Sequence, residues 1–185
     1  MNREDRLRPA DHRRVAEFVG KTAGIQLPEH KRNLVETRLR RRVKATGRDS
    51  FTSYLDFALS ADGEAGEQVL LIDALTTNKT DFFREAAHFE FLADYVRKTL
   101  APMGTTGFTR PFKVWSAACS TGEEPYTLAM VLSELAAEIS GFRFEIVATD
   151  IAPSVLDIAR KGIYPKARVA PVSESLRKKY LLRSR

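Results

Sequence analysis

Two apolar strand-like segments separated by one amphipathic helix dominate the second half of this 185-residue sequence. The first segment runs from Phe112 to Ala118, where we expect a buried strand centred on Val114 and Trp115. The second runs from Phe144 to Ala148, and leucines recur on one face of the intervening helix. A further helical segment, opened by Pro153, follows the second run. Strand, helix, strand and helix in this order predict a parallel sheet with right-handed crossover connections, as in an α/β protein.

The sheet predicted from these segments is too small to stand alone. Only 35 residues follow Asp150, and they contain Pro171 and a short basic helix, whereas a further strand–helix unit needs about 30 residues. Two parallel strands cannot by themselves bury both faces. Either something absent from the chain completes the sheet, or the chain is a fragment, and we expect a fragment.

The first 75 residues have helical periodicity and contain no credible strand. Val15, Phe18 and Val19 begin one apolar stripe, and two more helices start at Phe51 and near Glu67. Between the first stripe and the helix that starts at Phe51, a helix bounded by Pro28 and Gly47 has one apolar face, formed by Leu34, Val35, Leu39 and Val43. We therefore expect a small helical bundle over residues 1–75, followed by an α/β domain over residues 76–185.

Positive charge is concentrated in two segments of an otherwise acidic chain. Residues 31–48 hold eight basic residues and one acid, and residues 160–185 hold nine and one. Arg38, Arg41 and Arg42 fall largely off the apolar face of their helix, so we expect them to point outward. Such a surface attracts acidic partners, although a merely solvated helix face is the alternative. Nucleic acid is not expected, because aromatic residues are not interleaved with the basic run.

Several classes of protein are excluded by what the chain contains. Cys119 is the only cysteine, so neither an intrachain disulfide nor a thiolate metal cluster is possible. The three histidines lack metal-ligand spacing, and we expect no metal site. No apolar run approaches the roughly 20 residues of a membrane helix, and the N-terminus lacks a secretory signal. We expect a soluble cytoplasmic protein that does not insert into membranes.

The loops that follow the two predicted strands contain the first group of candidate site residues. Ligands of open α/β sheets bind outside the carboxyl ends of the strands, where Glu123, Glu124 and Asp150 are expected. Asp150 suits ribose hydroxyls, although all three acids equally suit helix N-termini. The first loop has one glycine where a pyrophosphate-binding fingerprint has three, which favours an adenosine ligand without phosphates.

A second group of candidates precedes the sheet, at Asn78, Thr80, Arg84 and Glu85. If this segment folds over the strand ends, the planar guanidinium of Arg84 could bind a carboxylate. The alternative is an N-capped helix whose neighbouring phenylalanines lie in the core. The sequence alone leaves both interpretations open.

Four stretches of sequence resemble one known family. They are Leu-Thr-Thr-Asn-Lys-Thr-Asp-Phe-Phe-Arg-Glu (residues 75–85), Val-Trp-Ser-Ala-Ala-Cys-Ser-Thr-Gly-Glu-Glu-Pro-Tyr (114–126), Asp-Ile (150–151) and Ala-Arg-Lys-Gly-Ile-Tyr (159–164). With them the chain resembles the chemotaxis receptor methyltransferases, CheR-type protein-glutamate O-methyltransferases, from about residue 15 to residue 180. The resemblance implies an α/β fold in which a small N-terminal helical bundle precedes a partial Rossmann-like S-adenosylmethionine-dependent methyltransferase domain.

The resemblance also implies roles for individual residues. The S-adenosylmethionine site would be formed by Asn78, Thr80, Arg84, Glu124 and Asp150. Arg84, the one catalytic candidate, would pair with the methionine carboxylate of the cofactor, and Asp150 would hold its ribose. The outward face of the basic helix, at Arg38, Arg41 and Arg42, would contact the acidic cytoplasmic helices of methyl-accepting chemotaxis receptors.

The implied reaction is transfer of a methyl group from S-adenosylmethionine to receptor glutamates, which leaves S-adenosylhomocysteine. Family members continue with further strands that complete the cofactor pocket, and these are absent from the sequence. The alternative is therefore a catalytically incomplete receptor-docking or adaptor module.

Overall fold

The computed structural model of the chain describes residues 5–60, 63 and 66–182. The chain divides into two compact units, residues 1–77 and 78–185. The expected domain boundary, after residue 75, falls just before this division. The basic residues Arg183 and Arg185 lie outside the described residues.

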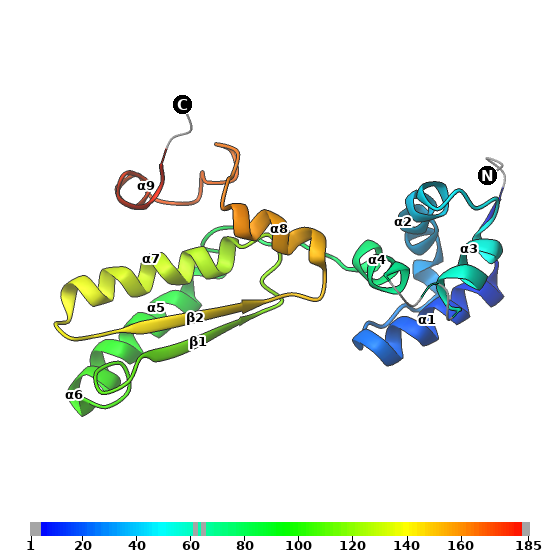
Figure 1. Ribbon diagram of the computed structural model, residues 1–185. Helices are drawn as coiled ribbons and strands as arrows, with labels where there is room; N and C mark the ends of the chain where they lie inside the picture. Colours follow the sequence, from blue (N-terminus) through cyan, green and yellow to red (C-terminus); the bar gives the residue numbers. More distant parts are fainter. Residues whose placement is uncertain (1–4, 61–62, 64–65, 183–185) are drawn as a thin grey trace. The chain divides into compact units, whose positions relative to one another are not determined.

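All the regular elements among the described residues of the first unit are helices, as the periodicity predicted (Figure 1). Its elements are α1 (Pro9–Ala23), the 3₁₀ turn η1 (Glu29–Lys31), α2 (Arg32–Ala45), α3 (Phe51–Ala58) and α4 (Glu67–Leu75). Ser50 caps α3, since its hydroxyl accepts from the amide of Ser53 at 3.1 Å. Gly24 ends α1 in the left-handed conformation that favours glycine.

One hydrophobic core holds these helices together, and α2 differs in detail from the expected pattern. Val35, Leu39 and Val43 are buried, but Leu34 is 44% exposed. Successive residues lie about 100° apart around a helix, so a side chain next to Val35 points to the flank of the stripe. Instead the single acid of this segment, Glu36, is buried, and it accepts hydrogen bonds from the Leu7 amide at 3.0 Å and from Arg40 at 2.6 Å.

The second unit is an α/β structure built around two parallel strands. Its elements are α5 (Ala86–Tyr95), the π-helical turn η2 (Val96–Leu100), α6 (Ala101–Met103), β1 (Phe112–Ala117), α7 (Glu123–Glu138), β2 (Phe144–Thr149), α8 (Pro153–Lys161) and α9 (Glu174–Tyr180). The strands pair in parallel from Phe112 opposite Phe144 to Ala117 opposite Thr149, with α7 as the crossover. The predicted order of strands and helices is confirmed.

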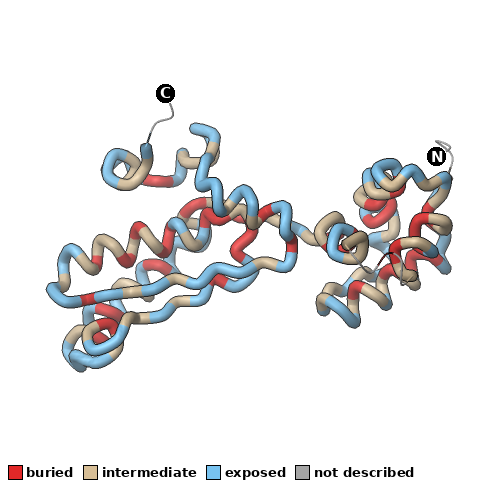
Figure 2. Tube along the Cα trace, in the orientation of Figure 1, coloured by how far each residue is buried: buried red, intermediate tan, exposed pale blue. Residues whose placement is uncertain are grey.

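The two faces of the sheet have different environments. Val114 and Ile146 pack with η2 and α7 in one hydrophobic cluster, whereas Trp115 and Val147 on the other face are 69% and 45% exposed. Figure 2 shows exposed residues recurring along both strands, with a run of them at the end of β2. The expectation that Trp115 lies at the centre of a buried strand is therefore wrong. The face that carries Trp115 also carries the Lys113–Glu145 ion pair, and it is not covered within the described residues.

A third cluster joins the end of the chain to the region before the sheet. Phe82, Met130 of α7 and Val172 are buried together, with Tyr164 and Val169 packed against them. The segment after α8 thereby lies against residues 82–83 and α7. None of the helices in the described part of the chain is long and apolar enough to cross a membrane.

Candidate functional site

The carboxyl end of β1 opens into a cavity of about 490 Å³, lined also by the segment before α5 and by the first turns of α7. Of the predicted cofactor residues, Thr80, Arg84 and Glu124 line this cavity together. Phe89, Leu92, Val114, Trp115 and Leu128 supply its apolar wall. A volume in this range, with a few polar groups on an apolar lining, is typical of small-molecule sites.

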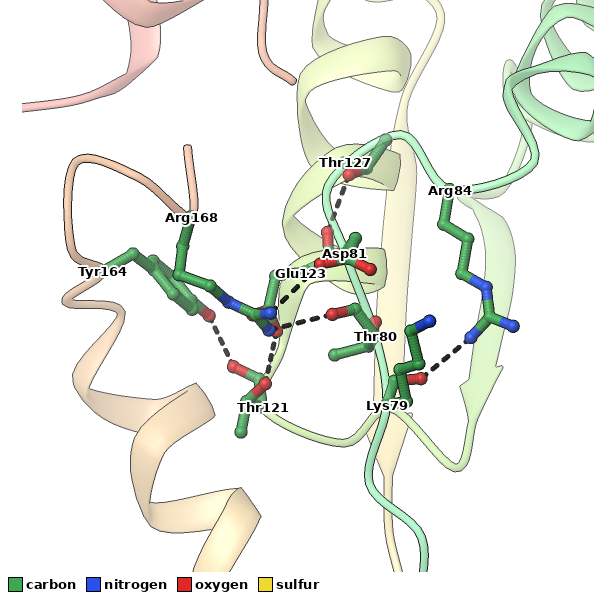
Figure 3. A network of polar contacts seen from close by, with 9 residues as sticks. All are labelled: Lys79, Thr80, Asp81, Arg84, Thr121, Glu123, Thr127, Tyr164 and Arg168. Atoms are coloured by element: carbon green, nitrogen blue, oxygen red, sulfur yellow. Dashed lines mark hydrogen bonds and ion pairs between the residues drawn. The ribbon is translucent and has the colours of Figure 1, made fainter. Parts of the chain in front are cut away.

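Arg84 is exposed at the rim of the cavity, and its donors are only partly used. Its Nη1 donates to the carbonyl oxygen of Lys79 at 2.9 Å, which turns the segment back on itself (Figure 3). Among the described residues this is the one hydrogen bond of a guanidinium that carries five N–H donors. The remaining donors are available to an anionic group in the cavity.

The two adjacent glutamates at the start of α7 have separate roles, which their sequence position could not distinguish. Glu124 lines the cavity and accepts a hydrogen bond from the Ser116 hydroxyl at 2.7 Å. Glu123 points the other way, is 1% exposed, accepts from the Thr121 hydroxyl at 2.5 Å and pairs with Arg168. Of the two carboxylates, that of Glu124 is the one placed for a ligand.

Asp150 lies just after β2, and its carboxylate supports the surrounding backbone. Oδ2 accepts from the Ser120 amide at 2.7 Å, and Oδ1 accepts from the Ala152 amide at 2.9 Å, just before α8. The N-cap residue of α8 is Ala152, so Asp150 lies before the helix and not in its first turn, where the helix-terminal alternative would place it. Each carboxylate oxygen retains a second lone pair that could accept from a hydroxyl. Asp150 and Asn78 do not line the cavity with Thr80 and Arg84.

The backbone around the cavity contains four non-glycine residues in the left-handed region. They are Phe83 and Glu85 before α5, and Ala118 and Ser120 after β1, with φ values between 51° and 57°. This conformation is costly for residues with a Cβ atom and is concentrated at functional sites in proteins generally. The strain therefore lies in the two segments that frame the cavity.

The sole cysteine lies in surroundings that disfavour its reactive thiolate form. Cys119 is buried, and burial, followed by the nearby Asp150 carboxylate, raises the pKa of its thiol. A thiol with a raised pKa stays protonated at neutral pH. Among the described residues, no group of three His, Cys, Asp or Glu side chains is placed to hold a metal ion.

Arg168 is the residue that sequence reasoning missed at this site. It lies in the loop after α8 and contacts both the segment before α5 and the first turn of α7 (Figure 3). Its partners are 87 and 45 positions away along the chain, so no local spacing in the sequence indicates the contact. The net positive charge of residues 160–185 was the only signal.

The three arginines predicted to contact a substrate lie on α2 in the first unit and differ in their surroundings. Arg38 donates to the carbonyl oxygens of Leu75 and Thr76, at 2.6 and 3.1 Å. Arg42 forms two hydrogen bonds to Glu67, at 3.0 and 2.7 Å. The Arg41 side chain is exposed and forms no hydrogen bond or ion pair with any described residue. Of the three, only Arg41 presents an uncommitted guanidinium.

Comparison with known proteins assigns both units to one family. Residues 10–76 match the family model described as CheR methyltransferase, all-alpha domain, and residues 78–185 match the one described as CheR methyltransferase, SAM binding domain.

Individual relatives agree with this assignment. The chain is 42% identical over 182 residues to chemotaxis protein methyltransferase 2 of Pseudomonas aeruginosa. This alignment covers 98% of the chain and 61% of the relative. It is 40% identical to the chemotaxis protein methyltransferase of Borreliella burgdorferi (91% of this chain, 59% of the relative). It is also 40% identical to that of Salmonella typhimurium (96% and 58%). The chain thus spans about three fifths of the length of these curated relatives.

Proposed function

The chain belongs to the CheR methyltransferase family, and from this premise we propose that it binds S-adenosylmethionine and acts in methylating glutamate side chains of chemotaxis receptors. Such receptors expose their methylated helices in the cytoplasm, so the proposal includes a cytoplasmic location. The observation that carries the cofactor assignment is that Arg84 and Glu124 line one cavity.

The residues around the cavity fit the proposed cofactor. Its amino-acid end carries a carboxylate and an ammonium group, which match the free donors of Arg84 and the carboxylate of Glu124. The apolar wall formed by Val114, Trp115 and Leu128 suits an uncharged adenosine portion. Asn78, Thr80 and Asp150 complete the proposed binding set, with Asp150 accepting from the ribose.

The chemistry proposed here asks little of the protein beyond placement. When bound, the cofactor supplies a methyl group activated by a sulfonium. A receptor glutamate, with a reference pKa near 4.3, is already an anion at neutral pH, so no general base is needed. Effective molarities of about 10⁵ M or more in well-oriented models show that positioning alone can supply a large acceleration. Arg84 and Glu124 would fix the orientation of the two charged groups.

On the receptor side, we propose the exposed surface of α2 as the contact with acidic helices. Arg41 is the best placed of the predicted residues, while Arg38 and Arg42 would act mainly by holding the helix in its unit. A positive surface of this kind raises the rate of encounter with an acidic partner.

The cofactor proposal is tested by calorimetric titration of the chain with S-adenosylhomocysteine. We expect Arg84→Ala to weaken binding by about tenfold or more, because a charge-assisted pair is lost. Arg97→Ala is the matched control, since Arg97 pairs with Glu138 on the surface of the same unit. Equal affinity of the wild type and Arg84→Ala would contradict the assignment. A folded chain that does not bind at all would favour the receptor-docking module without catalysis.

A further inference from the structure

Arg168 connects two parts of the second unit that are distant in sequence. Its Nη1 lies 3.0 Å from Oδ1 of Asp81, and its Nη2 donates to the carbonyl oxygen of Thr80 at 2.8 Å. The same Nη2 pairs with the carboxylate of Glu123 at the start of α7. Figure 3 shows the guanidinium between the segment before α5 and the helix. One side chain thus bridges three acceptors.

The Glu123 end of this bridge is fixed. The Glu123 side chain is buried, and its second oxygen accepts from the Thr121 hydroxyl. A carboxylate in the first turn of α7 is also stabilised by the helix dipole. A buried carboxylate that is paired and hydrogen-bonded cannot move without losing these contacts. Arg168 is therefore anchored on α7, and its other contacts hold the segment that contains Thr80 and Asp81.

Within the described part of the unit, a few other contacts hold that segment in place. The Phe83 amide donates to the Thr127 hydroxyl of α7 at 3.2 Å. The ring of Phe82 packs edge-on against Tyr164, with centroids 5.0 Å apart, and Tyr164 donates to the carbonyl oxygen of Thr121 at 2.6 Å. Phe82 and Phe83 are thus held on their side. Before them, Arg168 supplies the polar contact that ties residues 80–81 to α7.

We propose that Arg168 is a positioning residue, which holds the segment of residues 78–85 against α7 and thereby sets Thr80 and Arg84 at the cavity. This inference rests on the proposed function in one respect, since it takes that cavity to be the cofactor site. Arg168 itself does not line the cavity, so it acts through the segment and not on the ligand.

Hydrogen exchange of the backbone amides in residues 78–85 tests the proposal without any ligand. We expect Arg168→Ala to speed their exchange about tenfold, since a charge-assisted contact opposes local opening. Lys166→Ala is the matched control, because Lys166 is exposed in the same loop and its loss removes the same charge. Arg168→Lys should restore part of the protection, since it keeps the charge but loses the planar fork.

A second variant covers the case in which Arg168→Ala unfolds the unit by leaving Glu123 buried without a partner. Asp81→Ala keeps the pair between Arg168 and Glu123 and cuts only the carboxylate contact to the segment. We expect it to speed exchange in residues 78–85 and not within α7. The proposal is overturned if amide exchange in residues 78–85 is as slow in Asp81→Ala and in a folded Arg168→Ala as in the wild type. It is also overturned if Lys166→Ala speeds that exchange as much as Arg168→Ala does.

Titration of the same variants with S-adenosylhomocysteine separates this proposal from the function it builds on. We expect affinity to fall several-fold in Asp81→Ala, to fall further in Arg168→Ala and to stay unchanged in Lys166→Ala. If the wild type does not bind, the proposed function fails, while the exchange data still decide whether Arg168 holds the segment. Faster exchange with unchanged affinity would overturn the positioning role.

Discussion

Replacing Arg42 by alanine should destabilise the first unit, although the sequence places this residue on an outward basic face. The Arg42 side chain is only 23% exposed, and that of its partner Glu67 is 9% exposed. Glu67 also accepts a hydrogen bond at 2.8 Å from the hydroxyl of Tyr54, which is fully buried. Burial first, and then the Glu67 carboxylate, raises the pKa of Tyr54, so its hydroxyl remains a donor.

The magnitude follows from what Arg42→Ala leaves behind. Breaking a buried ion pair by removing one partner costs about 3–5 kcal/mol, because a charge remains without compensation. Arg42 keeps some contact with solvent, so we expect about 2–3 kcal/mol. For a unit of this size each kcal/mol corresponds to a shift of about 4–8 °C in melting temperature. The midpoint should therefore fall by roughly 10–20 °C.

The assays are thermal and urea denaturation, both followed by circular dichroism, with Arg41→Ala as the matched control. Arg41 is exposed on the same helix and removes the same charge, so its loss should change the free energy of unfolding by less than about 0.5 kcal/mol. The single tryptophan, Trp115, lies in the second unit, and its fluorescence reports whether that unit is unaffected. Equal stability of the two variants would refute the reasoning.

Three further predictions concern other positions. Burial lowers the pKa of His12 below its ordinary value of 6.5. As pH falls from 7.5 to 5.5, the His12 imidazole is therefore protonated at a higher pH in the unfolded chain than in the folded chain. The free energy of unfolding should then decrease, by at most about 1.4 kcal/mol per pH unit, and His12→Leu should flatten this slope in urea titrations. Gly122→Ala should destabilise the second unit by about 1–3 kcal/mol in the same assay, because Gly122 has a φ of +97° and a Cβ atom there would lie 2.7 Å from the Tyr164 hydroxyl. An unchanged free energy of unfolding would contradict this backbone geometry. Trp115→Ala should cost less than about 1 kcal/mol by circular dichroism, and a loss of 3–5 kcal/mol would mean that the residue is buried.

Local patterns allowed much of the fold to be predicted. Apolar spacing identified the helices of the first unit, because burial of one stripe depends on a period fixed by helix geometry. The parallel pairing of β1 and β2 followed from the order of strands and helices. At the candidate site, Thr80, Arg84 and Glu124 line one cavity, and their role in binding a cofactor stays a prediction.

What could not be predicted depends on contacts between distant residues. Arg42 was expected to point to solvent, but its partner Glu67 lies 25 residues further along the chain. Glu123 and Glu124 are adjacent and chemically alike, so only the packing of α7 decides which one is buried. The exposure of Trp115 likewise depends on which face of the sheet other elements cover. Periodicity indicates the apolar faces of an element but not its neighbours in space.

The left-handed residues around the cavity have a consequence for how it tolerates change. The left-handed backbone conformation costs about 1 kcal/mol or more at each of Phe83, Glu85, Ala118 and Ser120. The surrounding packing must therefore impose the shape of the cavity. The cavity is therefore preorganised during folding, and a ligand need not order it. Its shape in turn depends on the stability of the whole unit. Substitutions far from the cavity that loosen this packing should distort it while the helices and strands still form.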